Sequence, residues 1–506
     1  MLFAALTSAE KPWQVPAALF VLNDLEEAGY FYHDLTQMLG EAQVLFLPSS
    51  YKRAIKYGQK DSANEVLRTE VLTRLSELKI ENGKLKINST ETCEEHENRP
   101  DGNNSQFSIL KRSSLAEGKS NSQLYIVTYP DALAELVVSQ NTLTDRSLAL
   151  AVGDTKEIPA VETMLVGEGF ERVDYVYEPG QFAVRGSIID VFSYASEYPF
   201  RIDFFGDEID SIRTFEIESQ LSRDKVSHVS IVPNFDGVGE QGMVSFFNFL
   251  PEGSALAFQD YLWVHERLEQ LNEEGLSLQA VQVADEATDC SLNLLDAADF
   301  IRKTQAFRRI EFGTKASTTV QATVNFETSP QPLFHKNFEL VEQSLTDLIA
   351  RGYQLYILTD SAKQAERLKT IFEERGSEIP FTAVDKTIHG GFTDATMRVA
   401  CFTDHQIFDR FHKYNLRSDK ARSGKMAISL KELSQFEPGD YVVHIDHGVG
   451  RFAGLVRMPN GNSTQEVIKL VYSNDDVVFV SIHSLHKISK YKSKEGEALR
   501  FNKLDT

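Results

Sequence analysis

Some residue clusters in this 506-residue chain have types and spacings that suggest chemistry, beginning with possible phosphate binding. Gly118-Lys119-Ser120 matches the end of a phosphate-binding loop, but Ser113 replaces the leading glycine of GxxxxGK[ST]. Such a loop works when a preceding strand and a following helix N-terminus aim backbone N–H groups at phosphate, and neither element is evident here. The pairs Gly83-Lys84 and Gly424-Lys425 lack both the hydroxyl residue and the leading glycine. We therefore expect no nucleotide site in this sequence.

Two further groups could suggest acid/base or metal chemistry. Asp404 and His405 are adjacent, but no nucleophile or third group has a matching spacing, so we interpret them as a helix cap and a surface residue. The pairs His444/His447 and His483/His486 lack a nearby cysteine, and His444 and His447 fall on a strand and turn where their rings should diverge. We predict no catalytic residue and no metal site.

A different pattern, over residues 200–205, indicates binding rather than catalysis. Alternation along this expected strand directs Ile202 and Phe204 to the core, and Arg201, Asp203 and Phe205 outward. Phenylalanine and arginine are enriched in protein–protein interfaces, and arginine is frequent among hot spots. The pattern leaves two interpretations open: an interface, or a Phe205 that packs under a neighbouring loop.

Three expected strands between residues 175 and 215 position these side chains. Glu178-Pro179-Gly180 forms a turn before the first, because proline presets φ and glycine allows positive φ. The second covers residues 200–205, and Gly206-Asp207 turns the chain into the third.

The same stretch resembles the second domain of the transcription-repair coupling factor (Mfd) family, which is similar to the UvrA-binding domain of UvrB. The resemblance is carried by residues 185–190 (RGSIID) and 201–211 (RIDFFGDEIDS). In that family two arginines and a phenylalanine of these motifs contact UvrA. The resemblance therefore implies UvrA-binding roles for Arg185, Arg201 and Phe205.

Composition limits the remaining possibilities. A hydrophobic content of 42% supports packed cores, and no apolar run reaches the length of a membrane span. The three cysteines are far apart and fit a reducing cytoplasm better than a disulfide framework. A net charge of −22 would repel a phosphate backbone, so protein partners are favoured over nucleic acid.

The order of expected elements predicts a multi-domain α/β protein. Residues 1–149 alternate strands and helices as in a RecA-like sheet, which the resemblance identifies as a degenerate UvrB-like module. Residues 2–9 are expected to be the end of a helix. Further helices are expected over 25–39, 63–78 and 131–138, and strands over 18–22, 44–47 and 124–128. Residues 81–121 are polar and are predicted to be a disordered insertion.

The inserted α+β UvrA-binding domain is expected over residues 150–232, beginning with a helix over 158–168. A helix over 260–273 and a strand over 307–312 are predicted within residues 233–330, which the resemblance implies complete the first domain. Residues 333–415 form a further small α/β domain, with helices over 338–350 and 361–374 and strands over 353–358 and 397–402. A basic linker covers 416–432, and it either contacts DNA or an acidic partner, or is simply solvated.

Residues 433–490 are predicted to be an all-β module, followed by a tail over 491–506. Strands are expected at 441–445, 455–458, 466–472 and 477–481, with glycines of residues 446–454 allowing a bent strand. The module resembles the RNA-polymerase-interacting, CarD-like domain of the same family, which implies a Tudor-like (SH3-like) barrel. Binding to the polymerase β subunit is then expected through an exposed strand edge and through Leu455, Arg457 and Met458. Alternatively, Met458 folds back over the barrel.

The resemblance covers nearly the whole chain and implies an adaptor that links stalled RNA polymerase to UvrA in nucleotide excision repair. Members of the family continue into an ATP- and Mg²⁺-dependent DNA translocase, whose motifs are missing from this sequence. We therefore expect a truncated chain without cofactor or enzymatic activity, contacting DNA only through the missing motor. Two alternatives stay open: an ATP-dependent DNA translocase, and a stand-alone CarD-like transcription regulator.

Overall fold

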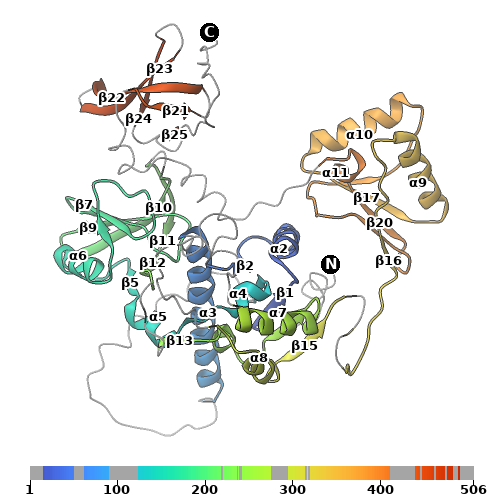
Figure 1. Ribbon diagram of the computed structural model, residues 1–506, viewed down its shortest axis with the longest axis horizontal. Coiled ribbons are helices and arrows are strands. Elements are labelled where there is room, and N and C mark those ends of the chain that lie inside the picture. Colours follow the sequence, from blue (N-terminus) through green and yellow to red (C-terminus); the bar gives the residue numbers. More distant parts are fainter. Residues whose placement is uncertain are drawn as a thin grey trace. The chain divides into compact units, whose positions relative to one another are not determined.

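The computed structural model describes residues 15–50, 62–90, 123–274, 294–410 and 439–490. Short gaps within these ranges fall at 218–219, 236–237, 239–241, 314–315, 317–318, 445–446, 461–462, 473–475 and 482–487. The described residues form helices and strands, many of which are labelled in Figure 1. Several predicted features lie outside them: the first helix, the Gly118-Lys119-Ser120 segment, the basic linker, the pair His483/His486 and the tail.

A five-stranded sheet joins strands from two distant parts of the sequence. Its order is β15 (Arg308–Glu311), β14 (Ala255–Phe258), β1 (Ala17–Val21), β3 (Leu124–Thr128) and β2 (Val44–Phe46). Neighbouring strands all pair in parallel, and β1, β2, β3 and β14 are buried along their whole length. Continuous apolar runs of this kind are typical of parallel strands buried on both faces.

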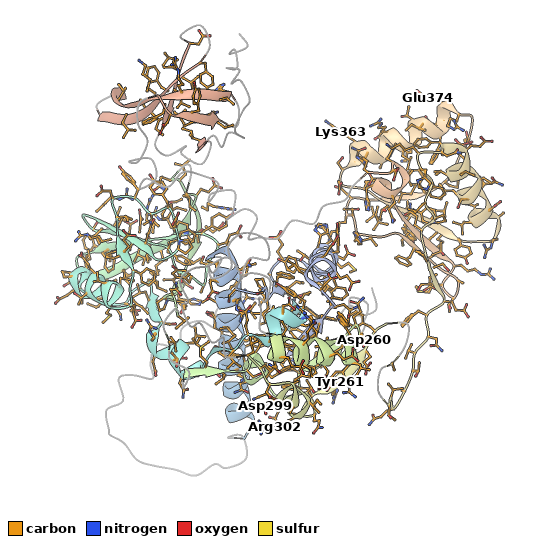
Figure 2. All side chains as sticks on the ribbon, in the orientation of Figure 1. Asp260, Tyr261, Asp299, Arg302, Lys363 and Glu374 are labelled. Carbon is orange, nitrogen blue, oxygen red and sulfur yellow. The ribbon has the colours of Figure 1, made fainter. Side chains whose placement is uncertain are left out.

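Helices next to this sheet begin where polar side chains accept hydrogen bonds from free backbone N–H groups. α2 (Leu25–Leu39) is capped by Asp24, which accepts from the N–H of Glu27 at 2.9 Å. α7 (Tyr261–Glu274) begins after Asp260, which accepts from the N–H of Trp263 at 3.0 Å (Figure 2). Such caps satisfy donors that the first helical turn leaves without a partner.

Two elements of the first segment differ from prediction. The helix expected over 131–138 ends early, as α4 (Pro130–Ala134), and Val137–Val138 form the short strand β4, which pairs with β13 (Met243–Val244). Two adjacent β-branched residues favour a strand over a helix. The helix expected over 63–78 continues as α3 (Ser62–Thr90) into part of the insertion predicted to be disordered. Its extension contains Lys84, Leu85 and Lys86, which are good helix formers.

A six-stranded sheet forms the domain that contains the arginine and phenylalanine motifs. Its order is β11 (Ser222–Val226), β10 (Glu208–Phe215), β9 (Phe200–Phe205), β8 (Ile188–Val191), β7 (Gln181–Arg185) and β6 (Glu171–Arg172). Where one strand was expected after residue 180, the structure has two, β7 and β8. The turn between them places Gly186 at φ 63°, a conformation that favours glycine.

One face of this sheet is covered by α6 (Ile158–Gly167). Val161 and Leu165 of the helix pack against Ile189, Ile202 and Phe204 of the strands in the main core of the domain. The short pair β5 (Leu148–Ala151) and β12 (His228–Ile231) also contributes to that core. Because α6 covers this face, the side chains that alternate with Ile202 and Phe204 project from the opposite one.

Residues 328–407 form a second sheet with accompanying helices; it contains both predicted strands and three that were not predicted. The strand order is β16 (Thr328–Pro330), β19 (Phe392–Asp394), β20 (Val399–Thr403), β17 (Gln354–Leu358) and β18 (Thr382–Val384). α9 (Phe338–Ala350), α10 (Ala362–Glu374) and the short α11 (Asp404–Ile407) accompany it. Leu345 and Leu348 of α9 and Leu368 and Phe372 of α10 pack against the strands.

The last described segment is an antiparallel sheet. Its order is β24 (Val477–Ser481), β23 (Ser463–Val471), β22 (Gly448–Asn460), β21 (Tyr441–His444) and β25 (Ile488–Lys490). The register of β22 and β23 shifts between Phe452 and Leu455, where Gly454 has φ 100°. This bulge provides the bend expected from the glycines of the segment. The predicted Tudor-like closure of the sheet stays a prediction.

Candidate protein-interaction surfaces

The face of the six-stranded sheet opposite α6 carries a row of charged side chains. Strand register places Asp190 opposite Arg201, and Arg201 opposite Arg213, on the neighbouring strands β8, β9 and β10. The next row along contains Ile188, Asp203 and Ser211. Charged side chains from three strands therefore meet on one face, which we call the arginine face.

Asp190 is the centre of the arginine face. Its carboxylate accepts from Nε of Arg201 at 2.7 Å and from Nη2 of Arg201 at 2.9 Å, and it also accepts from Nη2 of Arg185. The Asp190 side chain is only 1% exposed, whereas the Arg201 and Arg185 side chains are 15% and 37% exposed. Hydrogen bonding to Asp190 raises the pKa of Arg201, which therefore stays charged. One buried carboxylate thus holds two partly exposed guanidinium groups in fixed orientations.

A second ion pair lies beside the first. Arg213 donates to the carboxylate of Asp203, and the Ser211 hydroxyl lies 3.5 Å from the same carboxylate oxygen. The three arginines and two aspartates of the face sum to one positive charge. An acidic partner would therefore be attracted, while the two carboxylates restrict the positions of the guanidinium groups.

Aromatic rings support both arginines that bind Asp190. The guanidinium carbon of Arg201 lies 4.5 Å from the ring centroid of Phe215, and that of Arg185 lies 5.1 Å from the ring of Tyr175. Phe215 is buried in a small apolar cluster with Val176, Ala183 and Phe192. Cation–π contacts of this geometry restrain the guanidinium groups further.

Phe205 lies at the end of β9 and is 84% exposed. The tight turn that follows places Gly206 at φ 66°, and Phe205 pairs with Glu208 across the hairpin. A phenylalanine ring this exposed gains almost nothing from its own domain. The interpretation that Phe205 packs under a neighbouring loop is therefore wrong.

Sequence reasoning placed three residues on this face and missed others that complete it. Alternation correctly directed Arg201, Asp203 and Phe205 outward, and Arg185 joins them through Asp190. Asp190 and Arg213 were missed, although alternation within β8 and β10 would have directed them outward too. The sequence pattern predicts a single strand after residue 180, whereas a turn divides it into β7 and β8. The neighbours of Arg185 were therefore misassigned, and the outward position of Asp190 was not recognised.

The antiparallel sheet of residues 441–490 contains the predicted polymerase-binding residues. Arg457 and Met458 lie in β22, opposite Glu466 and Gln465 of β23, but their side chains lie outside the described part of the chain. Leu455 is exposed, as is Val456 beside it. β22 and β23 form a hairpin, in which Asn460 pairs with Ser463. β24 forms one edge of the sheet and exposes Val477 and Phe479.

Asp404 and His405, whose types suggested acid/base chemistry, make contacts within the fold instead. His405 is buried, and the N-cap of α11 is Thr403 rather than Asp404, so the interpretation of a cap and a surface residue is wrong. Asp404 forms an ion pair with Arg410 at 2.5 Å, and Nε2 of His405 lies 3.0 Å from the carbonyl oxygen of His389. These contacts come from tertiary packing that the local sequence does not reveal.

The rings of His444 and His447 do not diverge as expected, because their centroids lie 4.6 Å apart. Among the described residues, no group of three histidine, cysteine or acidic side chains is arranged to hold a metal ion. A zinc site normally needs at least three protein ligands.

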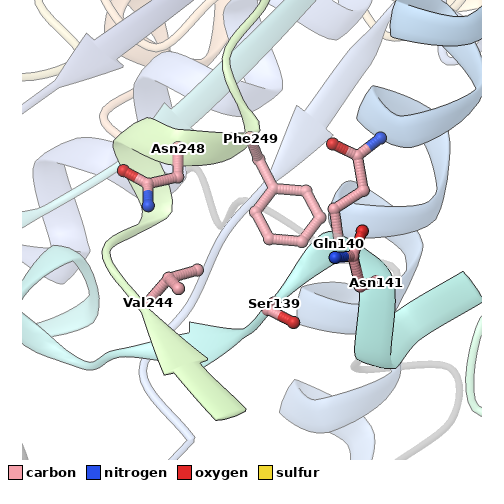
Figure 3. A pocket seen from close by; sticks show the side chains of 6 residues that line it. All are labelled: Ser139, Gln140, Asn141, Val244, Asn248 and Phe249. Carbon is pink, nitrogen blue, oxygen red and sulfur yellow. The ribbon is translucent and has the colours of Figure 1, made fainter. Parts of the chain in front are cut away.

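A shallow hollow of about 220 Å³ lies between β4, β13 and the helical turn η4 (Phe246–Phe249) (Figure 3). Its lining is mostly amide and apolar, from Ser139, Gln140, Asn141, Val244, Asn248 and Phe249. None of these side chains titrates near neutral pH, and small-molecule sites are generally larger. In the part of the chain that is described, no helix is both long and apolar enough to cross a membrane.

Comparison with known proteins assigns both surfaces to domain families. Residues 148–236 match the UvrB interaction domain, and residues 436–492 match the CarD-like/TRCF RID domain. Transcription-repair-coupling factors from Staphylococcus aureus (strain USA300) and Staphylococcus epidermidis (strain ATCC 35984) are each 24% identical over 468 residues. These alignments cover 78% of this chain, but the chain spans only about 40% of the length of the curated relatives it matches. The protein therefore combines a UvrB interaction domain with a CarD-like/TRCF RID domain, in a chain similar to transcription-repair-coupling factors over most of its length.

Proposed function

We propose that this chain is an adaptor that binds UvrA through the arginine face and RNA polymerase through its last described sheet. The observation that supports UvrA binding most is the combination of an 84% exposed Phe205 with two arginines that are oriented before any partner arrives. A preorganised surface loses little side-chain entropy on binding. The match of residues 148–236 to the UvrB interaction domain supports the same role.

The polymerase contact is assigned to the β subunit. The match to the CarD-like/TRCF RID domain supports it, as do the exposed Leu455 and the position of β24 at the edge of the described sheet. An edge strand can accept a partner strand through main-chain hydrogen bonds, while neighbouring side chains provide selectivity. The adaptor needs no ATP or Mg²⁺, and any DNA contact would belong to a motor outside this chain. In this proposal the first module is RecA-like and degenerate, and the last sheet closes as a Tudor-like barrel.

Calorimetric titration of the full chain with UvrA tests the first half of the proposal. Phe205→Ala should weaken binding about 30-fold, the loss expected for a hot spot of about 2 kcal/mol. Arg201→Glu should also weaken binding, because it opposes acidic groups on UvrA. Val166→Ala is a matched control, since Val166 is exposed on α6, which covers the opposite face of the sheet. Unchanged affinity in both folded arginine-face variants would refute the assignment.

A further inference from the structure

A row of charged side chains crosses four strands of the arginine face. Strand register places Asp190 opposite Arg201, and Arg201 opposite Arg213. It also places Arg213 opposite Lys225, which lies on β11. Residues directly opposite each other on neighbouring antiparallel strands project from the same face. Lys225 therefore belongs to the arginine face, although it and Arg213 lie outside the motifs that point to UvrA.

Carboxylates balance this row unevenly. Asp190 pairs with Arg201, and Asp203 pairs with Arg213. The Lys225 side chain is exposed, and no described residue forms a hydrogen bond or an ion pair with its ammonium group. Like charges directly opposite each other destabilise a sheet. The fold therefore holds Arg213 between two cations and gains no ion pair from Lys225.

The side chains of Arg201 and Arg213 differ in the donors that they leave for a partner. All three nitrogens of Arg201 donate within the domain, Nε and Nη2 to Asp190 and Nη1 to the carbonyl oxygen of Gln220 at 3.2 Å. Among the described residues, Arg213 donates only from Nη2, to Asp203, and its side chain is 30% exposed. The donors most available to a partner therefore lie on Arg213 and Lys225, whereas Arg201 is held mainly by its own domain.

A carboxylate is the partner group that fits this pair best. Cβ atoms of directly opposite residues lie about 4.5–5.5 Å apart, so one carboxylate can reach the guanidinium of Arg213 and the ammonium of Lys225 together. Each contact is a charge-assisted hydrogen bond, and the shared anion offsets the repulsion between the two cations. Because neighbouring strands lie about 4.8 Å apart, Lys225 extends the face about 10 Å across the sheet from Arg201.

We propose that Arg213 and Lys225 form a carboxylate-binding pair that extends the UvrA-binding face across β10 and β11. An aspartate or glutamate of UvrA lies over this pair, while the ring of Phe205 contacts the same partner at the end of β9. This inference rests on the proposed function, since it names the chemistry of the same partner at the same face. It adds two cations to Arg185 and Arg201.

Titration of the full chain with purified UvrA at several salt concentrations tests the pair. Lys225→Gln removes a charge that makes no contact within the domain, so the fold should be unaffected. Binding should weaken about fivefold, the upper range for an exposed charge pair. The affinity should also depend less steeply on salt, because one ion pair is lost. Lys225→Glu should weaken binding further, since its carboxylate would pair with Arg213 and repel the partner.

The contribution of Arg213 needs a variant that leaves no unpaired charge. Replacing Arg213 alone would leave Asp203 without its partner and destabilise the sheet. The double variant Asp203→Asn/Arg213→Gln removes the ion pair as a unit and leaves two amides that can hydrogen bond to each other. It should weaken UvrA binding about tenfold, with a circular dichroism spectrum like that of the wild type.

Arg223→Gln is the matched control. Arg223 lies on the same strand but on the opposite face, where it forms an ion pair with Glu216 at 3.7 Å and lies over the ring of Tyr198. It changes the net charge as Lys225→Gln does, and UvrA affinity should stay at the wild-type value. Wild-type affinity in Lys225→Glu or in the folded double variant, or an equal loss in Arg223→Gln, would overturn the inference, while a loss in Phe205→Ala would uphold the proposed function. Absence of binding by the wild-type chain would overturn the proposed function and the inference with it.

Discussion

The buried carboxylate of Asp190 should contribute more to the stability of its domain than any exposed charge on the same sheet. Asp190→Asn keeps the shape of the side chain but removes the charge that pairs with Arg201 and Arg185. Both guanidinium groups would then face an amide, and Arg201, which is 15% exposed, could not recover its lost partner from solvent. We therefore expect the variant to destabilise the six-stranded sheet.

The magnitude follows from the exposure of each pair. Removing one partner of a buried ion pair costs about 3–5 kcal/mol, because the remaining charge stays desolvated. The pair with Arg185 adds less than about 1 kcal/mol, since that side chain is more than one-third exposed and is screened by water. The amide oxygen of asparagine can still accept a hydrogen bond, which recovers about 1 kcal/mol. The net expectation is about 3 kcal/mol.

Hydrogen exchange followed by mass spectrometry measures this loss in the full chain without assuming two-state unfolding. Peptides that cover β7 to β10 should lose protection on the order of 100-fold, since about 1.4 kcal/mol corresponds to a factor of ten. Peptides from residues 328–407 should be unchanged. Asp210→Asn is the control, because Asp210 is exposed on β10 of the same sheet. Protection within threefold of wild type in Asp190→Asn would refute the reasoning that Asp190 stabilises the face.

Three other outcomes are expected. Met458→Arg should abolish capture of an RNA polymerase β-subunit fragment and leave UvrA affinity unchanged; capture by a folded variant would place the contact elsewhere. The purified chain should not hydrolyse ATP, because its sequence contains no GxxxxGK[ST], and DNA-stimulated turnover that persists through purification would contradict this. Burial raises the pKa of Cys401 to about 11. In a Cys93→Ser/Cys290→Ser background, the rate at which iodoacetamide alkylates Cys401 should therefore rise with pH, with a midpoint near pH 11. A midpoint near pH 9 would contradict the burial of this thiol.

Much of the secondary structure was predictable from local patterns. The helices α2 and α9 and the strands β3 and β9 occupy the predicted residues, because capping side chains, apolar periodicity and turn glycines act over a few residues. The errors occurred where tertiary pairing competes with local preference. Val137–Val138 have β-branched side chains that favour a strand, but their pairing partner β13 lies far along the chain, and no nearby residue indicates it.

The sequence by itself determined which side chains of β9 point outward, since alternation is a property of any strand. That Arg201 and Phe205 share a face opposite Ile202 and Phe204 therefore needed no structure. Only the tertiary structure decided that Asp190 from β8 would be buried beneath Arg201 and Arg185. It also decided that the ring of Tyr175 would lie against the guanidinium of Arg185. Contacts between strands depend on register, and register is set by the packing of the whole core rather than by any local run of residues.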